Sequence, residues 1–283
     1  MEADQKNVWG DLMIELTHLS LFSGIGGADL AAEWAGFTTV GQCEWADYPT
    51  KVLEKHWPNV PRWKDIRTLT KESFYEKTGL RTVDLISGGF PCQPFSVAGK
   101  RRGKEDDRYL WPEMLRVVQE IRPYWVIGEN VVGIISMELD TTLSDLENIG
   151  YTCQTFVIPA CAVDAPHRRD RIAVVANRLC NRSKTRFADS EKREKRKSNQ
   201  SFYGGKNVAN PESRWKQREK QIRSKTRRSC SYCEWPAEPD VGRVAHGVPH
   251  RVDRLKCLGN AIVPQQFYPI FKAIADIETG NII

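Results

Sequence analysis

The feature that most constrains the fold of this chain is an alternation of short apolar runs with longer amphipathic stretches between Leu16 and about Ala176. The runs have the length of buried strands, and the stretches have the spacing of helices that cover a sheet. Strands that alternate with helices form parallel sheets, so we expect an α/β fold. The candidate strands are residues 15–22, 38–44, 83–89 and 124–130, and two candidate helices are residues 28–36 and 108–121.

Two further segments extend this domain. The β-rich runs 151–160 and 171–176 flank the turn 165–170, which predicts a hairpin added to the sheet. After Leu255 the chain regains helical spacing, so we expect a C-terminal helix that packs back on the large domain. Its apolar residues are Phe267, Ile270, Phe271, Ile274 and Ile277.

Positive charge is concentrated in one segment. Residues 178–235 hold 18 Lys and Arg against 6 Asp and Glu, in a chain whose total net charge is only +6. Such a block usually binds a polyanion, most often nucleic acid, although a solvated surface insertion is the alternative. We therefore divide the chain into a large α/β domain (1–177), for which the motifs below predict catalysis and cofactor binding, a basic region (178–250), and a C-terminal segment (251–283) that completes the first domain.

The composition is that of a soluble globular protein. At 283 residues and 32.3 kDa, the chain has room for one large domain and one small one. It has no run of about 20 apolar residues and no secretory signal at its start, so we expect a cytoplasmic protein without a membrane segment. Eight cysteines are scattered without a tight framework, which favours reduced thiols.

A glycine-rich junction follows the first candidate strand. Phe22-Ser-Gly24-Ile-Gly26-Gly leads into a helix, and small residues there let backbone N–H groups approach a ligand. Asp29 stands where a dinucleotide fingerprint has its third glycine, which argues against a nicotinamide pyrophosphate. Glu44 closes the second strand where an acidic residue would bind ribose hydroxyls, and Trp45 beside it could stack on adenine. An adenosine ligand without phosphates suggests S-adenosylmethionine, and a surface carboxylate is the alternative for Glu44.

Cys92 is the candidate nucleophile. It follows the strand 83–89 directly, between Pro91 and Pro94, in a rigid turn at the edge of the sheet where open α/β folds bind ligands. A buried structural thiol would more usually lie inside an apolar run. Glu129 ends the next strand, so we expect it beside Cys92, in a largely apolar setting that raises its pKa and keeps a proton available.

The turn 165–170 adds two arginines. Arg169 and Arg171 are alternate residues, so they point the same way if the strand has begun. Their guanidiniums could bind a carbonyl oxygen or a phosphate, although an Arg-x-Arg pair is more often a solvated turn.

Together these motifs resemble the cytosine-C5 DNA methyltransferases of the stand-alone bacterial and phage type. FSGIGG, GGFPCQPFS, GENV, HRRDR and LGNAIVPQ occur in the order of that family and cover the chain except for roughly residues 178–250. The resemblance implies an S-adenosylmethionine-dependent methyltransferase with a Rossmann-like sheet. It also implies a target-recognition region inserted before the C-terminal helix, where the basic segment lies. His167 stands where the family usually has Gln.

The resemblance also implies roles for individual residues. Cys92 would attack C6 of a cytosine turned out of the DNA helix, Glu129 would contact N3 and the exocyclic amine, and Arg169 and Arg171 would hold the O2 side. The residues implied to surround S-adenosylmethionine are Phe22, Gly24, Gly26, Glu44, Trp45, Asp65, Ile66, Pro91 and Asn260. Lys100, Arg101 and Arg102 fall in a stretch similar to the mobile loop that closes over DNA in the family, or in a plain solvent loop.

The resemblance leaves alternatives open. A branch of the same family methylates tRNA, and a catalytically idle DNA-binding protein could keep the scaffold, although it would have no need for Cys92 and Glu129. Cys230 and Cys233 could be half of a zinc site, but two further ligands are needed and we expect no metal. We expect double-stranded DNA as partner, a monomer, and the cytoplasm of a bacterial or phage-infected cell. The sequence leaves open a cognate restriction endonuclease, in a restriction-modification setting, and the target site.

Overall fold

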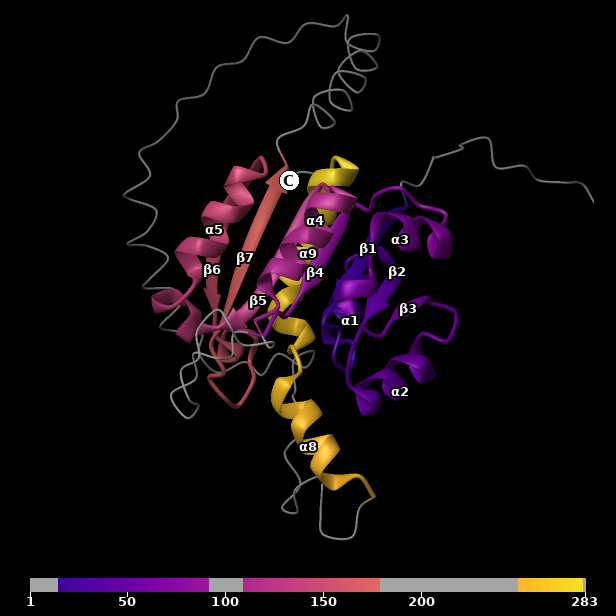
Figure 1. The fold of residues 1–283 in the computed structure, drawn as a ribbon. Helices are drawn as coiled ribbons and strands as arrows, with labels where there is room; N and C mark the ends of the chain where they lie inside the picture. The colour runs from indigo at the N-terminus through magenta and orange to yellow at the C-terminus, as the bar shows by residue number, and fades with distance from the viewer. Residues whose placement is uncertain (1–14, 92–108, 179–248, 282–283) are drawn as a thin grey trace, which may run out of the picture. The chain divides into compact units, whose positions relative to one another are not determined.

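The computed structural model describes residues 15–91, 109–178 and 249–281, which all belong to one compact unit (Figure 1). The predicted mobile loop, Cys92 and nearly all of the basic region 178–250 lie outside the described residues. The division of the chain into three parts therefore stays a prediction.

A seven-stranded sheet forms the centre of this unit. Its order is β3-β2-β1-β4-β5-β7-β6, and only β7 runs against its neighbours. The strands are β1 (Leu16–Leu21), β2 (Phe37–Cys43), β3 (Arg62–Trp63), β4 (Leu85–Gly88), β5 (Trp125–Val131), β6 (Tyr151–Ile158) and β7 (Arg171–Arg178).

Helices cover both faces of the sheet. The helices of the described residues are α1 (Gly27–Trp34), α2 (Asp47–His56), α3 (Lys71–Thr78), α4 (Trp111–Ile121), α5 (Leu139–Asn148), α8 (Arg251–Asn260) and α9 (Pro264–Thr279), with short 3-10 turns η1 (Ile66–Thr68), η3 (Val132–Ser136) and η4 (Ala160–Val163). Of these, α8 has no buried residue and projects away from the sheet (Figure 1). None of the helices in the described ranges is long and apolar enough to cross a membrane.

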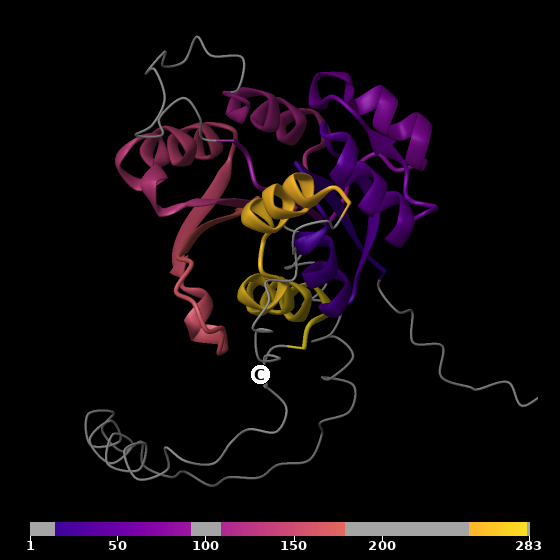
Figure 2. The same cartoon turned by 90° about the horizontal axis from the view of Figure 1, so that it is seen from below.

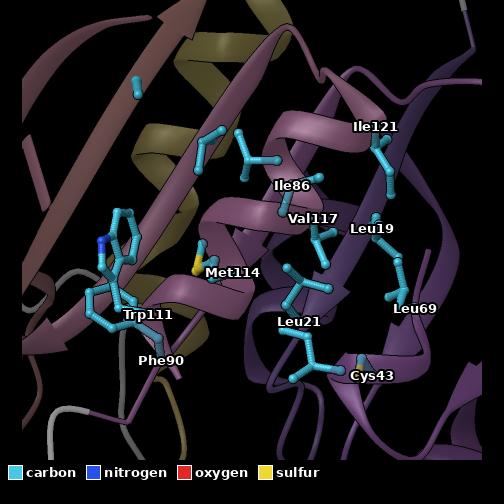
Figure 3. Packing of buried hydrophobic residues seen from close by; sticks show 14 of the residues in the cluster. Leu19, Leu21, Cys43, Leu69, Ile86, Phe90, Trp111, Met114, Val117 and Ile121 are labelled. Carbon is cyan, nitrogen blue, oxygen red and sulfur yellow. The ribbon is translucent and has the colours of Figure 1, made fainter. Parts of the chain in front are cut away.

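One core layer lies between the sheet and α3, α4 and α5. The period of two along β7 sends Ile172 and Val174 into this layer, where they join side chains of β1, β4 and β5. Figure 3 shows Met114 and Val117 of α4 lying over the strands, with Phe90 against Trp111, the first residue of that helix. This layer therefore holds Phe90, and with it the start of the turn that leads to Cys92.

The other core layer is formed by α1 and α9, which pack against each other and against the opposite face of the sheet (Figures 1 and 2). The predicted C-terminal helix is confirmed, since Phe267, Phe271 and Ile274 are buried here and Ile270 packs at the margin. Ile277, the last apolar residue of that spacing, is 38% exposed.

The α/β sheet predicted from the alternating pattern is confirmed. All four predicted strands are present with small differences at their ends, and β6 and β7 pair antiparallel as a hairpin. The strand β3 was not predicted, because two residues are too short to show a period. The order of strands reverses between β1 and β4, which places the carboxyl ends of β1, β2, β4 and β5 at the edge where α/β sheets bind ligands.

Candidate active site

The glycine-rich junction after β1 is a tight turn. Gly24 and Gly26 both have positive φ, at 57° and 86°, and Gly26 packs so closely that a Cβ there would lie 2.4 Å from the ring of Trp57. A Cβ at Gly24 would instead enter open space. Phe22 also adopts positive φ, at 52°, at the point where the chain leaves the strand. The backbone is therefore open to a ligand at Gly24, while Gly26 is packed against Trp57.

Glu44 is held at the end of β2 by two backbone amides. The N–H groups of Gly24 and Ala46 each donate to one carboxylate oxygen at 2.8 Å. A carboxylate oxygen can accept more than one hydrogen bond, so Glu44 can still accept from a diol. Trp45 beside it is 68% exposed. This arrangement links the glycine turn to an acidic group and an exposed aromatic ring.

Asp65 and Ile66 follow β3, on the same side of the sheet. Asp65 begins η1 and accepts from the amide of Arg67 at 3.0 Å, while the side chain of Ile66 is buried. These two residues are therefore fixed by local structure.

The turn toward Cys92 is described as far as Pro91. Phe90 is buried, and its carbonyl accepts a hydrogen bond from the side-chain amide of Asn130 at 3.0 Å. The other end of that amide accepts from the N–H of Val131 at 2.9 Å. Asn130 thus fixes the backbone two residues before Cys92, which itself lies outside the described residues.

Glu129 lies beside this turn, as its place on the neighbouring strand predicted. β4 and β5 are parallel neighbours, and an added Cβ at Gly89 would lie 2.9 Å from a carboxylate oxygen of Glu129. Glu129 is paired with Arg171, with 2.9 Å between the guanidinium Nε and the carboxylate, and both side chains are largely buried. Glycine at position 89 therefore leaves room for this ion pair.

The electrostatic setting of Glu129 differs from the largely apolar one that was predicted. Burial raises the pKa of Glu129, while Arg171, and more weakly Arg169, oppose that rise. The predicted direction of the pKa is confirmed because the cost of burying the carboxylate exceeds the effect of the arginines. The carboxyl group is thus a buried acid in direct contact with a guanidinium.

The two arginines of the turn do not share a target. The strand β7 begins only at Arg171, so the alternation rule does not apply to Arg169, whose φ is 37°. The guanidinium of Arg169 donates through one nitrogen to the carbonyls of Gly259 and Ala261, both at 2.7 Å. The prediction that the two side chains point the same way applied only if the strand had begun at Arg169, and the strand begins at Arg171.

Asn260 is the residue between Gly259 and Ala261 in the chain. It is the last residue of α8, and it is exposed. The next residues run against the glycine turn, since a Cβ added to Gly27 would lie 2.4 Å from the carbonyl oxygen of Ile262. The structure thus brings Asn260 to the region of Gly24 and Gly26, at the same edge of the sheet as Glu44.

Sequence reasoning missed two side chains that organise this edge. Asn130 belongs to a motif that was recognised, but no role was predicted for it. Gln266 is fully buried, and its amide donates to the carbonyls of Ile158 and, at 3.0 Å, of Arg169. A polar residue in the apolar pattern of the C-terminal helix was the available signal for Gln266.

The described residues hold no cluster of three or more His, Cys, Asp or Glu side chains that could bind a metal. Cys230 and Cys233 lie outside the described residues, as do Lys100, Arg101 and Arg102. The predictions for these five residues stay untested.

A family model for the C-5 cytosine-specific DNA methylases matches residues 16–243 of this chain. Among curated relatives, the Type II methyltransferase M.Eco47II of Escherichia coli is 38% identical over 57% of this chain and 39% of its own length. M.AquIA of Picosynechococcus is 34% identical over 57% of this chain and 71% of its own length. M.HhaI of Haemophilus parahaemolyticus is 32% identical over 58% of this chain and 49% of its own length. The matched part thus spans between about two fifths and seven tenths of these relatives.

A solved structure of an Escherichia coli prophage-encoded protein, described as a DNA modification methyltransferase, has a similar fold. Its TM-score is 0.51, with 26% identity over 58% of this chain and 47% of that one. The family model covers most of the chain. The chain therefore belongs to the C-5 cytosine-specific DNA methylase family.

Proposed function

We propose that this protein transfers the methyl group of S-adenosylmethionine to C5 of cytosine in a specific duplex DNA sequence. The observation that carries the proposal is the Glu129–Arg171 pair, set against Gly89 in the turn that leads to Cys92. Membership of the cytosine-C5 methylase family supports it. The relatives named above are Type II methyltransferases, which supports DNA as the substrate.

The chemistry accounts for the residue types. C5 of cytosine is a poor nucleophile until a thiolate adds to C6, and we propose Cys92 as that thiolate. Addition places negative charge on the ring, which a proton held near N3 neutralises. C5 of this neutral adduct can then take the methyl group from the sulfonium sulfur, and S-adenosylhomocysteine is the leaving group. Loss of the C5 proton to solvent, with return of the N3 proton to Glu129, breaks the C6–S bond and restores the thiolate of Cys92.

Glu129 is the proposed proton donor at N3. Its pKa is raised by burial, so its carboxyl group stays protonated to a higher pH than an exposed glutamic acid would. Arg171 contacts the same carboxylate and would stabilise the charge that remains on Glu129 after donation. The guanidinium of Arg171 can also donate to the O2 edge of the base. Turning the base out of the helix costs a few kcal/mol, which such contacts to its polar edge offset.

The residues at the carboxyl ends of β1, β2 and β3 fit S-adenosylmethionine. The open space at the Cβ position of Gly24 suits close approach of a ligand to the backbone, and Glu44, already oriented by two amides, suits ribose hydroxyls. Trp45, Asp65 and Ile66 would hold adenine, and Phe22, Gly26, Pro91 and Asn260 would complete the site. When bound, S-adenosylmethionine supplies an electrophilic methyl group on a sulfonium centre.

The basic region 178–250 is the proposed target-recognition region. Its excess of Lys and Arg supports binding to the phosphates of duplex DNA. We also propose that the protein acts as a monomer in the cytoplasm of a bacterial or phage-infected cell. A cognate restriction endonuclease is the partner that a Type II enzyme would have.

The test is methyl transfer from tritiated S-adenosylmethionine to mixed-sequence duplex DNA and, in parallel, to total tRNA, followed by bisulfite sequencing of the labelled nucleic acid. We expect label in DNA at one short cytosine context. Label in tRNA alone would replace the proposed substrate with RNA. Label in neither, with the cofactor still bound, would favour an idle DNA-binding scaffold.

Two variants assign the nucleophile in the same assay. Cys92→Ala should abolish transfer and leave the affinity for S-adenosylmethionine within a few-fold. Cys161→Ala is the matched control, because Cys161 is a free, exposed cysteine on η4. Persistent turnover by Cys92→Ala would overturn the assignment.

A further inference from the structure

Arg169 contacts a different part of the molecule from Arg171. Its guanidinium donates to the carbonyls of Gly259 and Ala261, whereas Arg171 takes the carboxylate of Glu129. The carbonyl of Gly259 belongs to the last turn of α8, where carbonyls lack helical partners and the helix dipole favours a cation. Arg169 therefore acts as a side-chain cap on the C-terminus of α8.

The backbone at Arg169 adopts a conformation that is costly for a residue with a side chain. Its φ of 37° lies in the left-handed region, which costs a non-glycine residue roughly 1 kcal/mol or more. Burial and the charge of Arg171 lower the pKa of the Arg169 guanidinium, and Glu129 partly opposes this. Both costs are offset by two charge-assisted hydrogen bonds.

The segment that Arg169 holds is fixed from the opposite side by the glycine turn. The carbonyl of Ile262 approaches Gly27 so closely that a Cβ there would lie at 2.4 Å, and backbone cannot give way as a flexible side chain can. Asn260 and its neighbours are thus confined between the first residue of α1 and the β6–β7 hairpin.

Gln266 on α9 contacts the same hairpin connection. Its buried amide donates to the carbonyls of Ile158 and Arg169, which are the two ends of the hairpin connection. The position of Arg169 is therefore set by α9 through its backbone, while its side chain sets residues 259–262.

We infer that Arg169 is a positioning residue that fixes the Asn260 segment of the cofactor site from the hairpin, and that it does not read the cytosine base. This inference rests on the proposed function, since it deepens the account of the cofactor site. It replaces the role that the family resemblance implied for Arg169, and it leaves Arg171 at the base.

The test compares Arg169→Ala, Arg169→Lys and Arg168→Ala in the full chain. Arg168 is the matched control, because it is the adjacent arginine and its exposed side chain pairs with Asp170. Two quantities are measured without DNA. They are the Kd for S-adenosylhomocysteine by titration calorimetry and the hydrogen exchange of amides in the peptide 257–263.

We expect Arg169→Ala to weaken S-adenosylhomocysteine binding about tenfold and to speed exchange in this peptide by a similar factor, because a charge-assisted bond to two carbonyls is lost. Arg168→Ala should stay within twofold of the wild type. Arg169→Lys should fall between them, since lysine keeps the charge at the end of α8 but has no planar fork. It also provides a measurement if the alanine variant unfolds.

Unchanged Kd and exchange in Arg169→Ala, with only the KM for DNA raised, would overturn the inference and place Arg169 at the base. A uniform gain in exchange across the whole sheet would also overturn it, because that would be a loss of global stability. If the wild type binds no S-adenosylhomocysteine, the proposed function fails, and the exchange comparison still decides whether Arg169 holds the segment.

Discussion

Replacing Gly89 by alanine is a sharp test of the site, because the change is one methyl group aimed at one carboxylate. The added Cβ would lie 2.9 Å from an oxygen of Glu129. Ordinary contact requires about 0.5 Å more, so the carboxylate has to move. It cannot move freely, because Arg171 holds it at 2.9 Å and its side chain is only 13% exposed.

The size of the effect follows from this displacement. A misplacement of about 1 Å at a reacting group costs roughly a hundredfold in rate, so a shift of about half that size should cost about tenfold or more. We expect the single-turnover rate of methyl transfer to fall by about one to two orders of magnitude, or roughly 1.4–2.7 kcal/mol in the barrier. The affinity for S-adenosylhomocysteine should stay unchanged.

The matched control is Gly133→Ala, in η3 just after β5, where an added Cβ would meet a flexible methionine side chain at 3.4 Å. It should keep the wild-type rate. Both variants should keep a cooperative thermal transition, since one overpacked methyl group costs about 1–3 kcal/mol at most sites. A Gly89→Ala protein that transfers methyl groups at the wild-type rate would refute the proposed role of Glu129.

Three further predictions concern other parts of the chain. Burial raises the pKa of Asp29 from 3.8 to about 6, so the free energy of unfolding should fall as pH rises between those values. In urea melts, the free energy of unfolding of Asp29→Asn should rise by about 2–3 kcal/mol relative to the wild type between pH 4 and 7, and a pH-independent difference would contradict this. Asn130→Ala removes the hydrogen-bond donor to the carbonyl of Phe90, so it should lower the single-turnover rate about tenfold and leave the cofactor affinity unchanged. An unchanged rate would show that Asn130 does not position the turn. Replacing four Lys or Arg residues between positions 192 and 228 by alanine should reduce the slope of log K for DNA against log salt by about 3–4, and an unchanged slope would place the DNA contacts elsewhere.

The sequence predicted the part of the fold that follows from periodicity. Apolar runs of the right length located β1, β2, β4 and β5, and the turn residues before Arg171 located the hairpin. The two residues of β3 carry no period of their own, because their pairing with β2 is a tertiary contact.

Strand adjacency explains which site contacts could be foreseen. Glu129 was expected near the turn to Cys92 because neighbouring parallel strands end at one edge, and the structure places it beside Gly89. The partner of Arg169 could not be foreseen, since it depends on the left-handed backbone at that residue and on where α8 ends. Gln266 joins segments about a hundred residues apart, a contact that no local pattern encodes.

The most direct test of the proposed function is to trap the covalent intermediate. Duplex DNA that carries 5-fluorocytosine at the target blocks the final elimination, because fluorine cannot leave C5 as a proton does. Incubation with S-adenosylmethionine, followed by denaturation, proteolysis and mass spectrometry, should yield a methylated base joined to the peptide that contains Cys92. An adduct on any of the other seven cysteines, or methyl transfer to ordinary DNA without an adduct on the fluorinated duplex, would contradict the account.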